Sequence, residues 1–342
     1  MAPGPRAEAG CRSVEPGANF RTGADYEGRA ENLKAGSFLI GPKASMQEIV
    51  AALTGEGQST CGTEINFRIG VLASDVVVRE LDPATNEYVE IAKFDPAAEA
   101  APEVYAERVE DASVRLRVTL AEGTTSWQAV EGLKLAGFLA GEVAEVPPEG
   151  SLAPDSYEVT KGSVRADVLA EMQRRQAAVL AETWEGRAEG LPYETPEEAM
   201  VMASIIEKET GVPEERRQVA SVFVNRLRQE MKLQTDPTVI YGLTKGQGAL
   251  GRGLRQSELR SNTPYNTYVI DGLPPGPIAN PGAESIRAAL DPDRTEFLFF
   301  VADGTGGHAF AETLAEHNDN VERWRAIEAE QGAEGETGTQ TE

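Results

Sequence analysis

The sequence predicts an α+β fold, because strand patterns and helix patterns come in groups rather than in strict strand–helix–strand alternation. Apolar residues alternate with other residues at 65–71, 76–78, 88–91 and 116–120, which is the spacing of half-buried strands. Helical patterns then dominate from 165 to 228. With 342 residues, of which 40% are hydrophobic, the chain is long enough for two or three domains with cores of their own.

The first part of the chain combines a flexible start with a small α/β pattern. Residues 1–30 are rich in Gly, Ala and Pro, are expected to be flexible, and contain no apolar signal-peptide core. A turn into a strand is predicted at 33–40. The residues S-M-Q-E at 45–48 form a capping box that opens a helix over 46–53. An acidic, alanine-rich connector is expected at 97–106.

The remaining elements follow from capping signals and apolar faces. From Ala326 onward the chain has five glutamates and no basic residue, which predicts a disordered acidic tail. In chain order, the sequence predicts a helix opening at 124–128, a loop at 147–154, helices at 165–187, 196–209 and 215–228, a buried strand at 296–301, a last helix at 314–327 and the tail at 328–342.

The charge of the chain excludes two classes of partner. The formal net charge is −24 at pH 7. Nucleic acids require a basic face, so nucleic-acid binding is not expected. The same acidity argues against docking on anionic lipid through a basic patch. No stretch approaches the roughly 18 uninterrupted apolar residues of a membrane-spanning helix.

Cysteine and histidine usage gives no sign of a metal or cofactor. Cys11 and Cys61 show no metal-ligand spacing, and a disulfide between them is left open because it requires an oxidising compartment. The two histidines, His308 and His317, are nine residues apart, which is no recognised zinc pair. We therefore expect no metal and no cofactor.

Glu209 is the best candidate for an acid–base group. Thr195 and Pro196 start a helix whose steps of three and four residues connect Met202, Ile205 and Glu209, so the carboxylate continues an apolar stripe. A carboxyl group on a buried stripe has its charged form disfavoured and its pKa raised. A general acid near neutral pH requires that property. The alternative is that Glu209 merely ends the helix and pairs with an arginine such as Arg226.

Gly/Pro-rich turns follow this helix and are expected to face Glu209. Gln234 and Asp236, which precede Pro237, could point toward one site from an extended or turn conformation. Glycines around His308 let the backbone approach a ligand closely, although a histidine that only supports a turn is an equal alternative. Three tyrosines offer flat faces with hydroxyl groups, useful against sugars but also common in ordinary cores: Tyr241, Tyr265 and Tyr268. This arrangement suits acid–base chemistry on a neutral polymer such as a glycan.

Together these motifs resemble the YceG-like family of endolytic murein transglycosylases. The strong matches span most of 191–325, and weaker ones extend toward the N-terminus. The strong matches are S-I-I-E-K-E-T (204–210), V-F-V-N-R-L (222–227), L-Q-T-D-P-T-V-I-Y-G (233–242), P-Y-N-T-Y (264–268), G-L-P-P-G-P-I-A-N-P-G (272–282), F-V-A-D-G-T-G-G-H-A-F (300–310) and E-H-N (316–318).

The resemblance implies a lyase that cuts nascent peptidoglycan within the glycan strand, terminates strand elongation and leaves a 1,6-anhydro-N-acetylmuramic acid end. The family's catalytic glutamate corresponds to Glu209. Substrate positioning, or support of the groups that contact substrate, is expected from Gln234, Asp236, Asn266, Tyr268, His308 and Asn318. Two alternatives stay open: a muramidase that uses water, and a non-catalytic peptidoglycan-binding scaffold for synthases.

The resemblance also implies a domain plan and a location. A LysM-like subdomain is expected at 31–160, with an insertion near 57–111, and a mixed α+β catalytic domain at 161–327. Peptidoglycan strands are the expected partner, with peptidoglycan synthases as further candidates. The family has an N-terminal membrane anchor and acts at the periplasmic face of the inner membrane. This sequence shows no anchor, and we expect a misassigned start or a trimmed segment to account for that.

Overall fold

The computed structural model describes residues 10–14, 24–26, 28–29, 36–40, 44–54, 62–82, 85, 87–111 and 114–337. Near its start, β1 (Gly10–Val14) pairs antiparallel with β2 (Gly36–Ile40). Part of the segment predicted to be flexible is therefore a paired strand. Helix α2 (Met46–Thr54) follows, and the predicted capping box is formed: the Ser45 amide donates to Glu48 Oε2 at 2.7 Å and the Glu48 amide to Ser45 Oγ at 3.2 Å.

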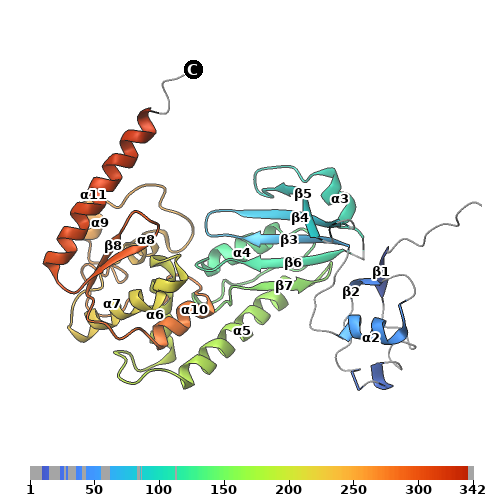
Figure 1. Ribbon diagram of the computed structural model, residues 1–342, viewed down its shortest axis with the longest axis horizontal. Coiled ribbons are helices and arrows are strands. Elements are labelled where there is room, and N and C mark those ends of the chain that lie inside the picture. Colours follow the sequence, from blue (N-terminus) through green and yellow to red (C-terminus); the bar gives the residue numbers. More distant parts are fainter. Residues whose placement is uncertain are drawn as a thin grey trace, which may run out of the picture.

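A five-stranded mixed sheet forms the middle of the molecule (Figure 1). Its order is β5-β4-β3-β6-β7; the β3–β6 pair is parallel and the other pairs are antiparallel. The bounds are β3 (Thr63–Ile69), β4 (Ser74–Asp82), β5 (Glu87–Phe94), β6 (Arg115–Leu120) and β7 (Ser156–Val159). The predicted strands are confirmed, and with the helices below they give an α+β fold.

The segment predicted as an insertion, 57–111, is not separable from this sheet. It supplies three of the five strands, and β3 lies between β4 and β6. The connector expected at 97–106 also differs, because α3 (Glu103–Arg108) begins within it and its Tyr105 ring lies edge-on to Phe94 at 5.1 Å. The likeness of this part to LysM stays a prediction.

The sheet shares its core with two helices. Helix α4 (Ser126–Leu135) begins at a capping box formed by Thr125 and Gln128, as predicted. Helix α5 (Arg165–Glu185) contributes Val168, Leu169 and Met172 to the same core. The alternating residues of the central strands, among them Ile65, Phe67, Val118 and Leu120, are at most 2% exposed. Burial of these side chains is what holds the strands to the helices.

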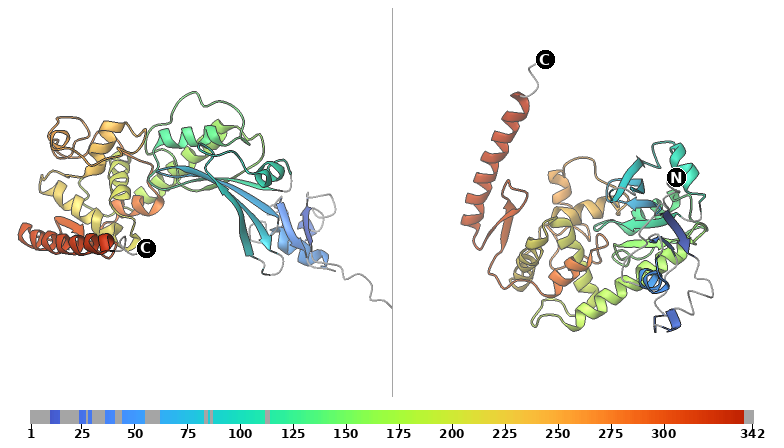
Figure 2. Two further views of the ribbon diagram at one scale, coloured as in Figure 1. Left: turned by 90° about the horizontal axis from the view of Figure 1, so that it is seen from above. Right: turned by 45° about the vertical axis from the view of Figure 1, so that its right-hand side comes forward.

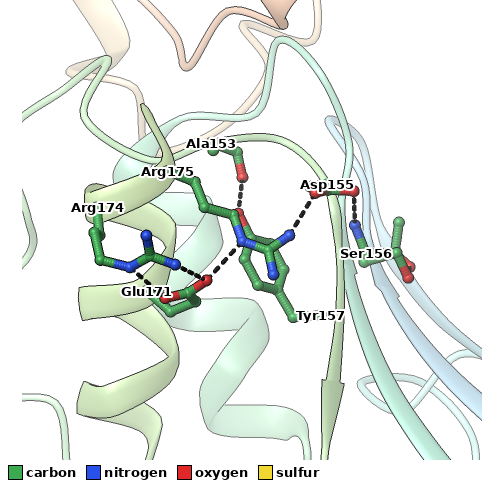
Figure 3. A network of polar contacts seen from close by, with 8 residues as sticks. Ala153, Asp155, Ser156, Tyr157, Glu171, Arg174 and Arg175 are labelled. Atoms are coloured by element: carbon green, nitrogen blue, oxygen red, sulfur yellow. Dashed lines mark hydrogen bonds and ion pairs between the residues drawn. The ribbon is translucent and has the colours of Figure 1, made fainter. Parts of the chain in front are cut away.

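A polar network joins α5 to the edge strand β7 (Figure 3). The Arg175 guanidinium donates to Glu171 Oε1 at 2.7 Å and to Asp155 Oδ2 at 2.6 Å. It also lies 4.7 Å from the centre of the Tyr157 ring, whose hydroxyl donates to the Ala153 carbonyl at 2.7 Å. These contacts fix the first half of α5 against the sheet.

The second half of the chain is mainly helical and has its own core. Its elements are α6 (Pro196–Glu209), a 3₁₀ turn η2 (Pro213–Glu215), α7 (Arg216–Arg228), α8 (Asp236–Thr244), α9 (Gln256–Leu259), α10 (Ala283–Leu290), the hairpin β8 (Phe299–Ala302) and β9 (His308–Ala311), and α11 (Leu314–Thr337). Val179, Leu180 and Trp184 of α5 pack against this second core. Figure 2 shows α5 reaching from the sheet to these helices, with α11 at the far side.

Loops around Asn280 connect the two cores. Asn280 is fully buried; its side-chain amide donates to the Thr124 carbonyl at 2.9 Å, and its Oδ1 accepts the Leu152 amide at 2.9 Å. Gln176 of α5 donates to the Pro281 carbonyl at 3.0 Å. Buried polar groups with complete hydrogen bonding specify one arrangement. The sheet and the helices are therefore joined through defined contacts.

Three predictions differ from the structure in this half. The motif at 233–242 is predicted as a turn, but Pro237 occupies the first turn of helix α8, where its missing N–H costs nothing. Helix α11 continues to Thr337, into the tail predicted to be disordered. Strand β8 is shorter than predicted and only half-buried.

Among the described residues, no helix is long and apolar enough to span a bilayer.

Candidate active site

Helix α6 presents Glu209 at its last turn. Thr195 caps the helix, with the Glu198 amide donating to its Oγ1 at 3.2 Å. Met202, Ile205 and Ile206 are 0% exposed, so the predicted stripe is the buried face of the helix. Glu209 is its last residue and is half-buried. The helix therefore holds the carboxyl group at the border between the core and the surface.

A threonine cluster fixes the orientation of this carboxyl group. The Thr235 hydroxyl donates a short hydrogen bond to Glu209 Oε1. Thr235 is itself fixed, because its amide donates to Thr267 Oγ1 at 3.0 Å and its carbonyl accepts the Thr238 hydroxyl at 2.8 Å. Gln234, just before it, has a left-handed backbone with φ of 50°. The turn that precedes α8 thus exists in one defined conformation.

The surroundings raise the pKa of Glu209. Burial is the main cause, and the nearby charge of Asp236 adds to it, while the Thr235 hydrogen bond and the charges of His308 and Arg226 act in the opposite direction. The raised pKa agrees with the prediction from the apolar stripe. It keeps a larger fraction of the group protonated near neutral pH.

The alternative in which Glu209 only pairs with Arg226 is wrong. In the described part of the chain, no carboxylate oxygen lies within 4.0 Å of the Arg226 guanidinium. Arg226 instead donates to the carbonyls of Leu298, at 2.7 Å, and Leu233. Burial lowers its pKa, while the charge of Glu209 raises it. Arg226 is therefore a nearby cation that acts on the charge of Glu209 without forming an ion pair with it in the described structure.

Asp236 and Tyr268 lie beside Glu209 and bind each other. The Tyr268 hydroxyl donates to Asp236 Oδ1 at 2.7 Å. Burial and this bond raise the pKa of Tyr268, and the charge of Glu209 contributes. Asp236 is exposed at the start of α8, as is Gln234 just before it. The structure thus brings Asp236 and Tyr268 close to Glu209, and Gln234 is exposed one residue before the Thr235 that binds Glu209.

His308 is oriented by a glutamate that sequence patterns do not reveal. Its Nδ1 lies 2.7 Å from Glu215 Oε2, and its amide donates to Glu215 Oε1 at 2.8 Å. Glu215 lies 93 residues earlier, at the end of the turn before α7. His308 therefore supports the β8–β9 hairpin and also acts electrostatically on Glu209. The role in supporting a turn is thus observed, and a contact of His308 with a ligand stays a prediction.

Two predicted residues lie differently. Asn266 is 0% exposed, and its amide donates to the carbonyls of Glu258, Leu259 and Ser261 at 3.1, 3.2 and 2.7 Å. It shapes the loop before Tyr268, whose amide donates to its Oδ1 at 3.1 Å, so its role is support. Asn318 is exposed on α11, and the structure shows no contact that brings it to Glu209.

Tyr241 and Tyr265 form a separate pair, with ring centres 5.0 Å apart. The Tyr241 hydroxyl donates to Glu149 Oε2 at 3.1 Å. Burial raises the pKa of Glu149, whose other oxygen accepts the Ser126 amide at 2.8 Å. These tyrosines belong to the junction between the cores rather than to the Glu209 site.

The described residues contain no group of three histidine, cysteine, aspartate or glutamate side chains that could hold a metal ion. The side chains of Cys11 and Cys61 lie outside the described part of the structure, so their pairing stays open.

Comparison with known proteins identifies the family of this chain. The model of the YceG-like family matches residues 10–323. The chain belongs to the YceG-like family. A crystal structure of a yceG-like protein from Listeria monocytogenes has the same fold, with a TM-score of 0.50 and 24% identity over 88% of this chain and 89% of that one.

Curated relatives of this family member carry an enzyme name. An endolytic murein transglycosylase of Bacillus subtilis is 37% identical over 178 residues, which are 52% of this chain and 48% of the relative. One from Streptococcus pneumoniae is 31% identical over 180 residues, 51% of this chain and 31% of the relative. The chain thus spans about half the length of the first relative and less than a third of the second.

Proposed function

We propose that this protein is an endolytic peptidoglycan lytic transglycosylase with Glu209 as its acid–base group. It cleaves the bond between N-acetylmuramic acid and N-acetylglucosamine in nascent strands and so ends their elongation. The observation that carries the proposal is the half-buried Glu209 carboxyl group, whose pKa is raised by burial and whose Oε1 accepts the Thr235 hydroxyl. Membership of the YceG-like family and the names of the relatives support it.

One carboxyl group is enough for the two proton transfers. Protonated Glu209 gives its proton to the glycosidic oxygen as the C1–O bond breaks and positive charge develops at C1 of the muramyl ring. The resulting carboxylate then takes the proton of the muramyl C6 hydroxyl, and O6 bonds to C1. This closes the 1,6-anhydro ring, returns Glu209 to its protonated form and consumes no water.

The intramolecular attack favours the lyase over hydrolysis. A hydroxyl held on the same sugar has an effective concentration of up to about 10⁵ M or more in favourable geometries, far above that of water. No second carboxylate is needed as a nucleophile in this scheme, because the muramyl C6 hydroxyl attacks C1; Asp236 accepts the Tyr268 hydroxyl. Asp236 and Tyr268 instead position the sugar rings, together with the exposed Gln234.

Location and partners belong to the same proposal. Murein is the substrate named for the relatives, and the protein acts on strands at the periplasmic face of the inner membrane, near the synthases that make them. The resemblance of the motifs to an anchored family supports this location.

Mass analysis of products from uncrosslinked nascent glycan tests the proposal. Wild type should produce anhydromuramyl ends, Glu209→Gln should produce none, and Glu197→Gln, an exposed glutamate of the same helix, should match wild type. Products heavier by one water would identify a muramidase. Binding without cleavage by wild type would identify a scaffold.

A further inference from the structure

A cavity lies beside the two elements that carry Glu209 and Asp236. This cavity, of about 220 Å³, opens between α8 and the β3–β4 turn, next to α4. Its walls are mainly aliphatic, from Val71, Leu72, Pro237, Ile240 and Leu250. Leu72 is 86% exposed at the tip of its turn, so the rim of the cavity presents apolar surface to solvent. Apolar surface of this kind often marks a ligand site.

Lys208 is the cation of this cavity, and no carboxylate in the described part of the chain forms an ion pair with it. Its ammonium group donates to the Gly123 carbonyl at 3.2 Å. Among the described residues, no carboxylate oxygen lies within 4.0 Å of it; Glu207, whose charge it feels, accepts the Gly282 amide at 2.9 Å. Burial lowers the pKa of Lys208. An ammonium group of this kind gains from a carboxylate that reaches it.

The other polar side chains of the cavity already bind protein groups. The Thr125 hydroxyl donates to the Gly246 carbonyl at 2.6 Å and the Gln128 amide to the Val71 carbonyl at 2.7 Å. The Thr244 hydroxyl donates to the Ile240 carbonyl at 3.0 Å, and Tyr241 binds Glu149. A sugar ring would require free donors and acceptors from these groups. The lining instead suits a ligand with aliphatic groups and one carboxylate.

The cavity and the Glu209 site are neighbours through two pairs of adjacent residues. Lys208 lines the cavity, and the next residue is Glu209, the proposed acid–base residue. Pro237 also lines the cavity, and the residue before it is Asp236, whose charge raises the pKa of Glu209. In murein, short peptides with alanine methyl groups and free carboxylates leave the muramyl ring at C3, close to the C1 that is cleaved. A stem of several residues, each spanning up to about 3.3–3.6 Å, can extend away from the cleaved bond along the neighbouring surface.

We propose that this cavity binds the peptide stem of the muramyl residue whose glycosidic bond is cleaved, with Lys208 receiving a stem carboxylate and the aliphatic walls receiving the alanine methyl groups. The inference rests on the proposed function and adds a specificity site to it. The enzyme thereby distinguishes strands that still carry stems from strands that have lost them.

Binding to the inactive Glu209→Gln protein tests the inference without turnover. Two uncrosslinked oligomers are compared by calorimetry: one with stems, and the same one after an amidase has removed them, which leaves only the lactyl carboxylate. The stem-bearing form should bind about tenfold tighter, the worth of a hydrogen bond to a charged group. The double variant Glu209→Gln/Lys208→Gln should lose that preference. The control double variant Glu209→Gln/Lys161→Gln, changed at an exposed lysine distant from Lys208 in the sequence, should keep it.

A second variant protects the test against misfolding. Leu72→Asp changes an exposed residue, so the fold should be retained while the rim of the cavity becomes less apolar. Binding of the stem-bearing oligomer should weaken, and binding of the stem-free oligomer should not change. Equal binding of both oligomers by the protein with Lys208 intact, or a preference that survives Lys208→Gln, would overturn the stem site only. Failure to bind either oligomer would overturn the proposed function as well.

Discussion

The Thr235 hydroxyl donates to Oε1 of Glu209 across 26 residues of sequence, and no arginine forms an ion pair with that carboxylate in the described structure. A neutral donor orients the carboxyl group and stabilises its ionised form less than a directly paired guanidinium would. This arrangement supports the proposed use of the group first as an acid and then as a base.

Replacing Thr235 by valine tests this orientation. In the wild type, the hydrogen bond from Thr235 lowers the pKa of Glu209. The isosteric valine variant lacks this donor, so the pKa of Glu209 should rise further. The alkaline limb of the pH–rate profile should move to higher pH, and kcat should fall about tenfold or more because the carboxylate is no longer aligned. Thr235→Ser should keep both properties; a valine variant with the wild-type profile would contradict this role.

Asp236→Asn should have the opposite effect on the pH profile. The charge of Asp236 raises the pKa of Glu209, so its removal should lower that pKa and move the alkaline limb to lower pH. Weaker substrate positioning should also raise KM several-fold, since Tyr268 loses its carboxylate partner. Asp271→Asn, at an exposed residue that pairs with Lys232 on the surface, is the matched control. The Asp236 charge raises the pKa of Glu209 and the Thr235 hydrogen bond lowers it. If Asp236→Asn and Thr235→Val shifted the alkaline limb in the same direction, these opposite effects would be refuted.

Glu215→Ala should weaken catalysis through His308. The variant removes both acceptors that hold the histidine, so the ring and the β8–β9 hairpin lose their orientation relative to Glu209. We expect kcat/KM to fall about tenfold, measured on uncrosslinked glycan, with little change for Glu214→Ala at the exposed neighbour. Activity that is unaffected by the loss of Glu215 would remove His308 from the site.

Glu209→Gln should stabilise the protein at neutral pH. The folded-state pKa of Glu209 lies above its ordinary value of 4.5, so the folded state binds the proton more tightly than the unfolded state. Stability from this group is present below the unfolded pKa and is lost as pH rises toward the folded pKa. The glutamine variant escapes that loss, and its thermal midpoint at pH 7 should be higher by roughly a few degrees. Thermal scans at pH 7 and pH 4 check this, because the difference should shrink at pH 4; a constant difference would argue against ionisation as the cause.

Local sequence patterns predict the structural features that depend on residues close together in the sequence. The cap at Thr195, the stripe from Met202 to Glu209 and the alternation in β3 each follow from the period of one element. Helix α8 escapes prediction because Asp-Pro is typical of a turn, although proline is also tolerated in the first turn of a helix. The continuation of α11 to Thr337 shows the same limit, since its acidic composition favours disorder over a helix.

Contacts between distant segments are beyond the sequence. Thr235 and Glu215 act on Glu209 and His308 through bonds that span 26 and 93 residues, and no periodicity encodes such a pairing. The motif of Asn266 allows it to touch substrate or to support groups that do; only its burial, at 0% exposure, decides for support. Asn318 stays a prediction from its motif alone.

Helix α5 has its first turns in one core and its last turns in the other. At about 1.5 Å per residue, its 21 residues form a strut roughly 30 Å long. A pull on the sheet would thus be transmitted lengthwise to the helices around Glu209 rather than absorbed by a hinge.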